Sequence, residues 1–243
     1  MVVNAVLFDL DDTLFDHRHA RMAALRAVRA DLRPLARFPL ARLDRTYEQI
    51  LTEIHFSQVL TGKISLEESR ALRMTTFLSE FGIEVLPAEV RRLLRTRQTA
   101  YRLQRRAVPG AIALLRFLRA SETAVGVVTN NLRSEQEEKL RTTGLDRWVD
   151  SLVCSEQVGV TKPDPRIFRA ALASVGGTPR TTVMVGDSWE SDVIGAAGVG
   201  IRPIWFHRDR TALPATPAAG ELRSFRPLAR ASALILGRRG RPS

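Results

Sequence analysis

The residues with the clearest chemical potential are carboxylates crowded directly behind an apolar run near the N-terminus. Residues 6–13 read VLFDLDDT, and a further acidic group, Asp187, follows a later apolar run. Because side chains alternate along a strand, Asp9 and Asp11 should point to one side and Asp12 to the other. Asp9, Asp11 and Asp187 would then form a hard-oxygen site suited to Mg²⁺, which binds few carboxylates and keeps water positions for phosphate oxygens.

Two further polar segments follow apolar runs in the same way. Thr129-Asn130 comes directly after residues 124–128, and Lys162-Pro163 follows the run at residues 151–154. In an open parallel sheet the ligand lies at the carboxyl ends of the strands, so these segments should meet the carboxylates. The alternative, a polar turn at residues 9–12 that only caps a helix, does not explain why four such segments occur together.

The elements that would position these residues alternate between strand and helix. Apolar, β-branched runs predict strands at residues 2–8, 124–128, 151–154, 182–185 and 202–206. Helical periodicity separates the later runs, at residues 110–120, 133–143, 165–175 and 189–198. This alternation predicts an α/β fold, a Rossmann-like parallel sheet with helices on both faces.

A block with helical periodicity interrupts that pattern after the first strand. Its predicted helices cover residues 17–32, 40–60, 66–81 and 87–106. We therefore predict a core made of residues 1–14 and 107–243, with a helical insertion at residues 15–106. Residues 208–227 contain several prolines and alanines and are interpreted as a loop before a last short helix.

Composition limits the class of protein. No run in the 243 residues approaches the roughly 20 apolar residues of a membrane span, and the single cysteine, Cys154, fits a reducing cytoplasm. The net charge is +11, but 34 of the 37 basic residues are arginines spread through helical patterns, with few aromatic residues between them. Nucleic-acid binding is therefore disfavoured. The one compact basic cluster, Arg238, Arg239 and Arg241, is predicted to be a disordered tail.

Four segments, taken in order and spacing, resemble the four motifs of the haloacid dehalogenase-like (HAD) hydrolase superfamily. They are Asp9-Leu10-Asp11-Asp12-Thr13, Thr129-Asn130, Lys162-Pro163 and Gly186-Asp187-Ser188-Trp189-Glu190-Ser191-Asp192. The helical block is similar to the inserted cap of the subgroup that contains phosphoglycolate phosphatase, β-phosphoglucomutase and pyrimidine-nucleotide or sugar-phosphate phosphatases. Residues 144–163 also resemble the house-cleaning nucleotide phosphatases. The chain departs from many relatives at Asn131, where they have glycine, and asparagine tolerates the left-handed backbone angles that would preserve the turn.

The resemblance implies a role for each matched residue. Asp9 would be the nucleophile that forms an aspartyl-phosphate, and Asp11 the general acid and then the general base. Mg²⁺ would be held by Asp9, the main-chain carbonyl of Asp11 and Asp187. Thr129 and Asn130 would donate hydrogen bonds to the phosphoryl oxygens.

Lys162 and Asp192 complete the implied site. Lys162 would lie between the phosphoryl group and Asp9 as a compact point charge. Asp192 is grouped with the metal residues, but three roles remain open: a structural residue in the first turn of a helix, a holder of metal-bound water, or a partner of Lys162. His55 and His207 have no partner at catalytic spacing and are interpreted as structural.

The predicted function is Mg²⁺-dependent hydrolysis of a small phosphorylated metabolite, such as a nucleotide or a sugar phosphate, by a cytoplasmic monomer or homodimer. A dehalogenase would leave Asp11 without a task, and a phosphonatase would need support for Lys63, the one lysine of the insertion. A phosphomutase and a non-catalytic partner-binding protein remain alternatives on the same fold. The insertion holds 18 basic and 10 acidic residues, a net charge that favours anionic substrates without identifying them.

Overall fold

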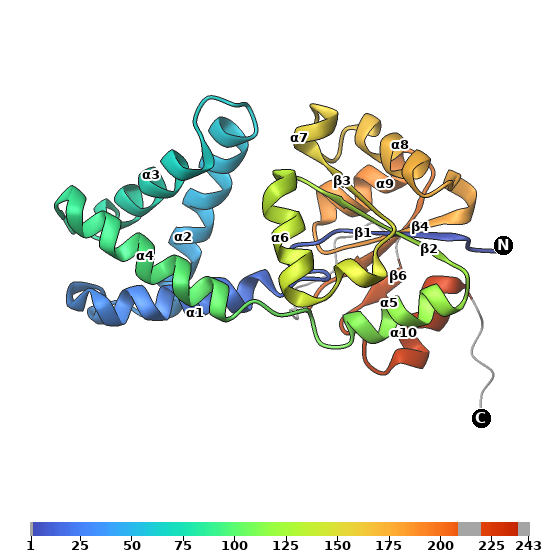
Figure 1. The fold of residues 1–243 in the computed structure, drawn as a ribbon, viewed down its shortest axis with the longest axis horizontal. Helices are drawn as coiled ribbons and strands as arrows, with labels where there is room; N and C mark the ends of the chain where they lie inside the picture. Colours follow the sequence, from blue (N-terminus) through green and yellow to red (C-terminus); the bar gives the residue numbers. More distant parts are fainter. Residues whose placement is uncertain (1, 209–219, 238–243) are drawn as a thin grey trace. The chain divides into compact units, whose positions relative to one another are not determined.

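The computed structural model describes residues 2–208 and 220–237, which form two compact units. One unit comprises Met1–Asp16 and Arg106–Ser243, and the other comprises His17–Arg105 (Figure 1). The insertion thus begins two residues later and ends one residue earlier than the sequence predicted. Residues 209–219, within the predicted loop, and the basic cluster at 238–241 lie outside the described residues.

One sheet of six parallel strands, in the order β3-β2-β1-β4-β5-β6, forms the centre of the first unit. The strands are β1 (Ala5–Phe8), β2 (Ala124–Thr129), β3 (Ser151–Cys154), β4 (Thr182–Gly186), β5 (Arg202–Phe206) and β6 (Gly220–Leu222). The predicted α/β, Rossmann-like fold is confirmed. Strand β6 falls within residues 208–227, so the prediction of an uninterrupted loop there was wrong: three residues pair with the edge of β5 without a strand-like run of apolar residues.

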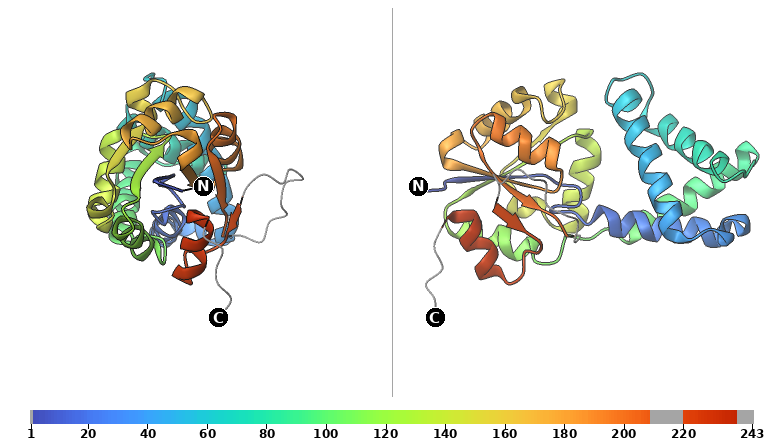
Figure 2. Two further views of the ribbon diagram at one scale, coloured as in Figure 1. Left: turned by 90° about the vertical axis from the view of Figure 1, so that its right-hand side faces the viewer. Right: turned by 180° about the vertical axis from the view of Figure 1, so that it is seen from behind.

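Helices cover both faces of this sheet (Figures 1 and 2). Helices α8 (Pro165–Ser174) and α9 (Gly195–Gly198) lie on one face, and α5 (Ala111–Ala120) and α10 (Leu228–Leu236) lie on the other. The remaining elements of the unit are α6 (Arg133–Thr143), η3 (Asp146–Trp148), α7 (Ser155–Val158), η4 (Pro179–Thr181) and η5 (Trp189–Ile194). Leu7, Phe168 and Met184 are fully buried in the core beneath α8.

The start of α8 has a direct cause in the sequence. Asp164 is its N-cap, because its side chain accepts a hydrogen bond from the main-chain N–H of Arg166. Pro165 occupies the first helical position, where no main-chain N–H is needed. The loop that carries Lys162 is therefore held at a defined helix start.

The second unit is entirely helical over the described residues. Its elements are α1 (His17–Asp31), η1 (Arg33–Arg37), α2 (Leu40–Ile54), η2 (His55–Val59), α3 (Leu66–Ser79) and α4 (Pro87–Leu103). The helix predicted at residues 40–60 thus ends with a turn of π-helix. Leu43, Tyr47 and Phe77 lie in its buried core, and a capping box of Ser65 and Glu68 starts α3. None of the helices in the described ranges is both long and apolar enough to span a bilayer.

The position of β1 determines where a site can form. It pairs with β2 on one side and with β4 on the other. The chain after β1 therefore first builds the sheet toward one edge, through β2, and later toward the opposite edge, through β4. Such a reversal of strand order opens a crevice at the carboxyl ends of the central strands, where ligands bind in folds of this kind. Asp9 follows β1 at this point.

Candidate active site

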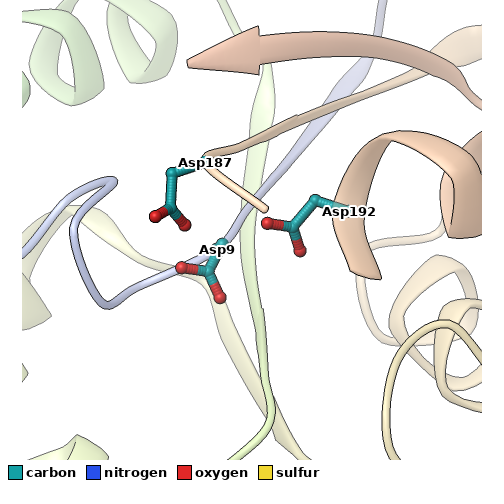
Figure 3. A group of neighbouring side chains, drawn as sticks. All are labelled: Asp9, Asp187 and Asp192. Atoms are coloured by element: carbon teal, nitrogen blue, oxygen red, sulfur yellow. The ribbon is translucent and has the colours of Figure 1, made fainter. Parts of the chain in front are cut away.

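Three carboxylates converge where β1 and β4 end (Figure 3). One oxygen from each of Asp9, Asp187 and Asp192 lies within 4.8 Å of the others. The main-chain N–H of Asp9 donates to the carbonyl of Val185 at 2.9 Å, which fixes Asp9 beside β4. Asp187 directly follows β4, and Asp192 belongs to η5. The parallel register of β1 and β4 therefore brings together residues that are almost 180 positions apart.

Lys162 is the cation of this cluster. Its Nζ donates to Asp9 Oδ1 at 2.6 Å, to Asp192 Oδ1 at 2.6 Å and to the carbonyl oxygen of Val128 at 2.9 Å. These acceptors match the three N–H groups of an ammonium, and the Lys162 side chain is 2% exposed. Burial alone would lower the pKa of Lys162, but the charges of Asp192 and Asp9 raise it above its ordinary value. Lys162 is therefore a fixed positive charge.

Asp192 holds Lys162, one of the three roles that the sequence left open. Its Oδ1 accepts from Lys162, and its Oδ2 accepts from the main-chain N–H of Ser188 at 3.0 Å. Gly186 makes room for it, since a Cβ at that position would lie 2.3 to 2.5 Å from the Asp192 side chain. Both oxygens of Asp192 are engaged by the chain, so this residue anchors the lysine.

The electrostatics of the cluster favour a hard divalent cation. Burial raises the pKa of Asp9 to about 7 despite the opposing charge of Lys162. Burial, followed by the charge of Asp9, also raises the pKa of Asp187 well above its usual range. No hydrogen bond or ion pair reaches the Asp187 carboxylate from residues 2–208 or 220–237. Three carboxylates against one ammonium leave an excess of negative charge on oxygen donors, which fits Mg²⁺.

The Asp11 carboxylate lies outside this cluster, contrary to the sequence prediction. Lys139 Nζ on α6 is 2.7 Å from both of its oxygens, and Gln136 Nε2 donates to Oδ2 at 3.1 Å. The prediction was wrong because β1 ends at Phe8, so strand alternation does not extend to Asp11. The chain turns instead, with Asp12 at a φ of 61°.

Asn130 and Thr129 have distinct surroundings. The Asn130 carboxamide receives the main-chain N–H of Lys162 at 2.7 Å and donates to the Lys162 carbonyl at 3.0 Å. In this structure it positions Lys162, which differs from the phosphate contact that we predicted. Thr129 Oγ1 accepts from Gln136 Nε2 at 2.7 Å, so this contact does not use the hydroxyl hydrogen.

Asn131 keeps the turn in a way that the sequence did not predict. Its φ is not positive, because Asp12 and Glu122 are the non-glycine residues with positive φ in the described ranges. Its side-chain Oδ1 accepts the main-chain N–H of Leu132 at 2.8 Å. The left-handed conformation is therefore unnecessary here.

Sequence reasoning missed four residues that support the site. Lys139 and Gln136 hold Asp11, the Trp205 indole donates to the Asp187 carbonyl at 2.8 Å, and Arg208 contacts Asp12. Lys139 had a usable signal, because it is one of only three lysines. Trp205 and Arg208 lie at and after β5, and no motif marks them.

Known proteins are similar to this chain in sequence. A family model described as haloacid dehalogenase-like hydrolase matches residues 3–200. Glyceraldehyde 3-phosphate phosphatase of Methanothermobacter thermautotrophicus is 30% identical over 86% of this chain and 88% of its own length. Pyrimidine 5'-nucleotidase YjjG of Escherichia coli is 40% identical over 42% of this chain, a match that spans only 47% of that relative.

Solved structures share the fold over nearly the whole chain. The magnesium-bound HAD-hydrolase YfnB of Bacillus subtilis has a TM-score of 0.74 at 24% identity and covers 96% of this chain and 99% of its own. A dehalogenase captured with an intermediate has a TM-score of 0.76 at 20% identity and covers 94% of this chain and 96% of its own. At these identities the similarity establishes the architecture alone, so the chemistry must be argued from the site.

Proposed function

Because the chain belongs to the haloacid dehalogenase-like hydrolase family, we propose that it is a phosphatase that hydrolyses a small phosphate monoester with Mg²⁺. The observation that carries this proposal is the Lys162 ammonium fixed between Asp9 and Asp192, beside the Asp187 carboxylate. Such a set presents a nucleophile, a fixed cation for phosphoryl oxygens and an oxygen-rich metal site in one crevice.

Asp9 is the nucleophile in this proposal. One of its oxygens attacks phosphorus, the bond from phosphorus to the ester oxygen breaks, and an aspartyl-phosphate forms. Lys162 orients the carboxylate and offsets the charge that gathers on the phosphoryl oxygens. The Thr129 hydroxyl, which already accepts from Gln136, donates its hydrogen to one of these oxygens.

The metal would be held by Asp9, Asp187 and the main-chain carbonyl of Asp11. Mg²⁺ bound there supplies positive charge between the attacking carboxylate and the phosphate, which reduces their repulsion. The Trp205 indole, through its hydrogen bond to the Asp187 carbonyl, holds Asp187 at the end of β4. Asp192 keeps its place on Lys162 and contributes to the charge of the site.

Removal of metal is expected to stop turnover. We expect the dialysed protein with excess EDTA to lose at least about a hundredfold in kcat, because Lys162 alone then opposes the repulsion between the Asp9 and Asp187 carboxylates and the substrate. Added Mg²⁺ should restore the rate. The measurement is phosphate release from p-nitrophenyl phosphate and from nucleoside monophosphates, glyceraldehyde 3-phosphate, phosphoserine and sugar phosphates. Full turnover after complete metal removal would contradict the metal role.

Asp11 is the acid and base. In its protonated form it gives its proton to the leaving alkoxide, and the resulting carboxylate then takes a proton from the water that attacks the aspartyl-phosphate, which releases inorganic phosphate and restores the protonated form. Asp11→Asn should slow phosphorylation by an alkyl phosphate at least about tenfold more than phosphorylation by p-nitrophenyl phosphate. The reason is that p-nitrophenolate leaves without much proton assistance. Single-turnover rates of the two esters test this, and equal losses would contradict the acid role.

The substrate is proposed as a small phosphorylated metabolite of the cytoplasm. Relatives named for pyrimidine nucleotides and for glyceraldehyde 3-phosphate are similar to this chain, so both belong in the substrate panel. Dehalogenases share the fold and provide the second candidate. That candidate has no use for an acid held as firmly as Asp11, and release of halide from a 2-haloacid, with no phosphate released from any ester, would favour it.

A further inference from the structure

The proposed function does not explain why the positive charge of Lys139 lies opposite the Asp11 carboxylate. Lys139 comes from α6, outside the four motif segments, and its Nζ is 2.7 Å from both Asp11 oxygens. The Lys139 side chain is 4% exposed, whereas that of Asp11 is 28% exposed. A lysine buried to this extent is costly unless it is paired. The ion pair therefore fixes both the lysine and the direction of the carboxylate.

Gln136, one helical turn before Lys139, supports the same carboxylate. Its Nε2 donates to Asp11 Oδ2 at 3.1 Å and to Thr129 Oγ1 at 2.7 Å, and the residue is completely buried. Its Oε1 is buried without a hydrogen-bond partner among the described residues. A buried oxygen without a hydrogen bond costs free energy. The position of the Gln136 amide is therefore explained by the two hydrogen bonds that its Nε2 donates. One face of α6 thus ties the end of β1 to the end of β2.

We propose that Lys139 and Gln136 are positioning residues that aim the Asp11 carboxylate for proton transfer. Asp11 lies beyond the last residue of β1, and its main chain forms only an isolated bridge with Phe15, so strand alternation does not set the direction of its side chain. Proton transfer requires the carboxylate within hydrogen-bond distance of the leaving oxygen and then of water. The contacts from α6 supply that restraint. The catalytic consequence rests on the proposed phosphatase function, whereas the ion pair itself does not.

The ion pair is tested without any assay of activity. The chain has only three lysines, and Lys63 is exposed, so ¹⁵N-lysine labelling should give two slowly exchanging ammonium signals, from Lys139 and Lys162. The signal that Lys139→Met removes is that of Lys139. Asp11→Asn should shift or broaden this signal and leave that of Lys162 in place. If Asp11→Asn leaves the Lys139 signal unchanged, the proposed ion pair between Lys139 and Asp11 is wrong.

The positioning role is tested by kinetics with two esters, glycerol 3-phosphate and p-nitrophenyl phosphate. In Lys139→Met we expect at least a tenfold loss of the single-turnover phosphorylation rate with glycerol 3-phosphate and less than a threefold loss with p-nitrophenyl phosphate. Lys139→Arg should recover most of the loss, because a guanidinium also contacts both carboxylate oxygens. Arg141→Met removes a charge from an exposed position of the same helix and serves as the matched control.

A double-mutant cycle separates positioning from a structural ion pair. When Lys139→Met or Gln136→Leu is added to Asp11→Asn, the phosphorylation rate should fall by less than a further twofold. The reason is that the acid these residues position is already absent. Additive losses, or equal losses with both esters, would show that these residues only stabilise the fold and would overturn the proposal. If the wild-type protein hydrolyses neither ester nor any other monoester, the phosphatase function fails and the catalytic role with it. The ammonium spectrum then decides on the ion pair alone.

Discussion

Asp9→Asn is expected to reduce turnover by on the order of 10⁴-fold or more, because an amide cannot serve as the nucleophile. The substitution keeps the shape of the side chain and an oxygen that can accept from Lys162, which donates to Asp9 Oδ1 at 2.6 Å in the native protein. With enough Mg²⁺ to compensate for weaker metal binding by the amide, the loss should therefore reflect the missing nucleophile. Measuring phosphate release from the best substrate of the panel, at saturating Mg²⁺, gives the effect.

The stability of Asp9→Asn provides the control for that measurement. Burial raises the pKa of Asp9 in the folded chain to about 7, from an ordinary 3.8. Between these values the folded state binds more protons than the unfolded state, so the free energy of unfolding falls as the pH rises toward 7. Above pH 7 the ionised Asp9 destabilises the metal-free fold, and a neutral asparagine removes that penalty. In EDTA at pH 8 the variant should unfold at a temperature no lower than that of the wild type.

Lys162→Arg is expected to lower kcat/KM about a hundredfold although it keeps the positive charge, equivalent to about 2.7 kcal/mol. The native ammonium contacts three acceptors at 2.6 to 2.9 Å in a buried space. A guanidinium is larger and planar and cannot reproduce three contacts that converge on one nitrogen. Overfilling this space would displace Asp9 or Asp192 from its position.

Two comparisons make the Lys162 result decisive. Lys63→Arg makes the same exchange at an exposed lysine of the second unit and should leave kinetics within twofold of the wild type. Lys162→Met removes the charge as well and should lose more than Lys162→Arg. Wild-type kinetics in a folded Lys162→Arg protein would show that charge alone suffices at this position.

The sequence was sufficient to predict that the polar segments lie at one edge of a parallel sheet. Each polar segment stands at the end of an apolar run, and in a parallel sheet all such ends share one edge. Asp9 and Asp187 follow β1 and β4, which the structure pairs side by side. The helix start at Asp164 and Pro165 was also predictable, since both residues have strong positional preferences.

The direction of side chains beyond the strand ends was not predictable in this way. Strand periodicity gives side-chain direction only while the chain is a strand, and β1 ends at Phe8. Asp11 therefore faces α6, and Asp192 takes the place beside Asp9 that we assigned to Asp11. Which of several open roles Asp192 fills depends on the space that Gly186 leaves, a property of packing between β4 and η5.

Lys139 and Gln136 were within reach of sequence reasoning. A lysine is unusual in a chain that otherwise uses arginine, and this marks Lys139 as well as Lys162. Their spacing of three residues on a predicted helix places them on one face. What the sequence lacked was the partner, because nothing in a helix pattern shows which loop its face will meet.

The most direct test of the account is a search for the phosphoryl group on Asp9 during turnover. The protein is mixed with Mg²⁺ and a good substrate, quenched in acid within milliseconds, digested and analysed by mass spectrometry. We expect the peptide that contains Asp9 to carry the mass of one phosphoryl group, and Asp9→Asn protein to carry none. Sustained phosphate release with no phosphoryl group on Asp9 at any quench time, or with the group on another residue, would contradict the central claim.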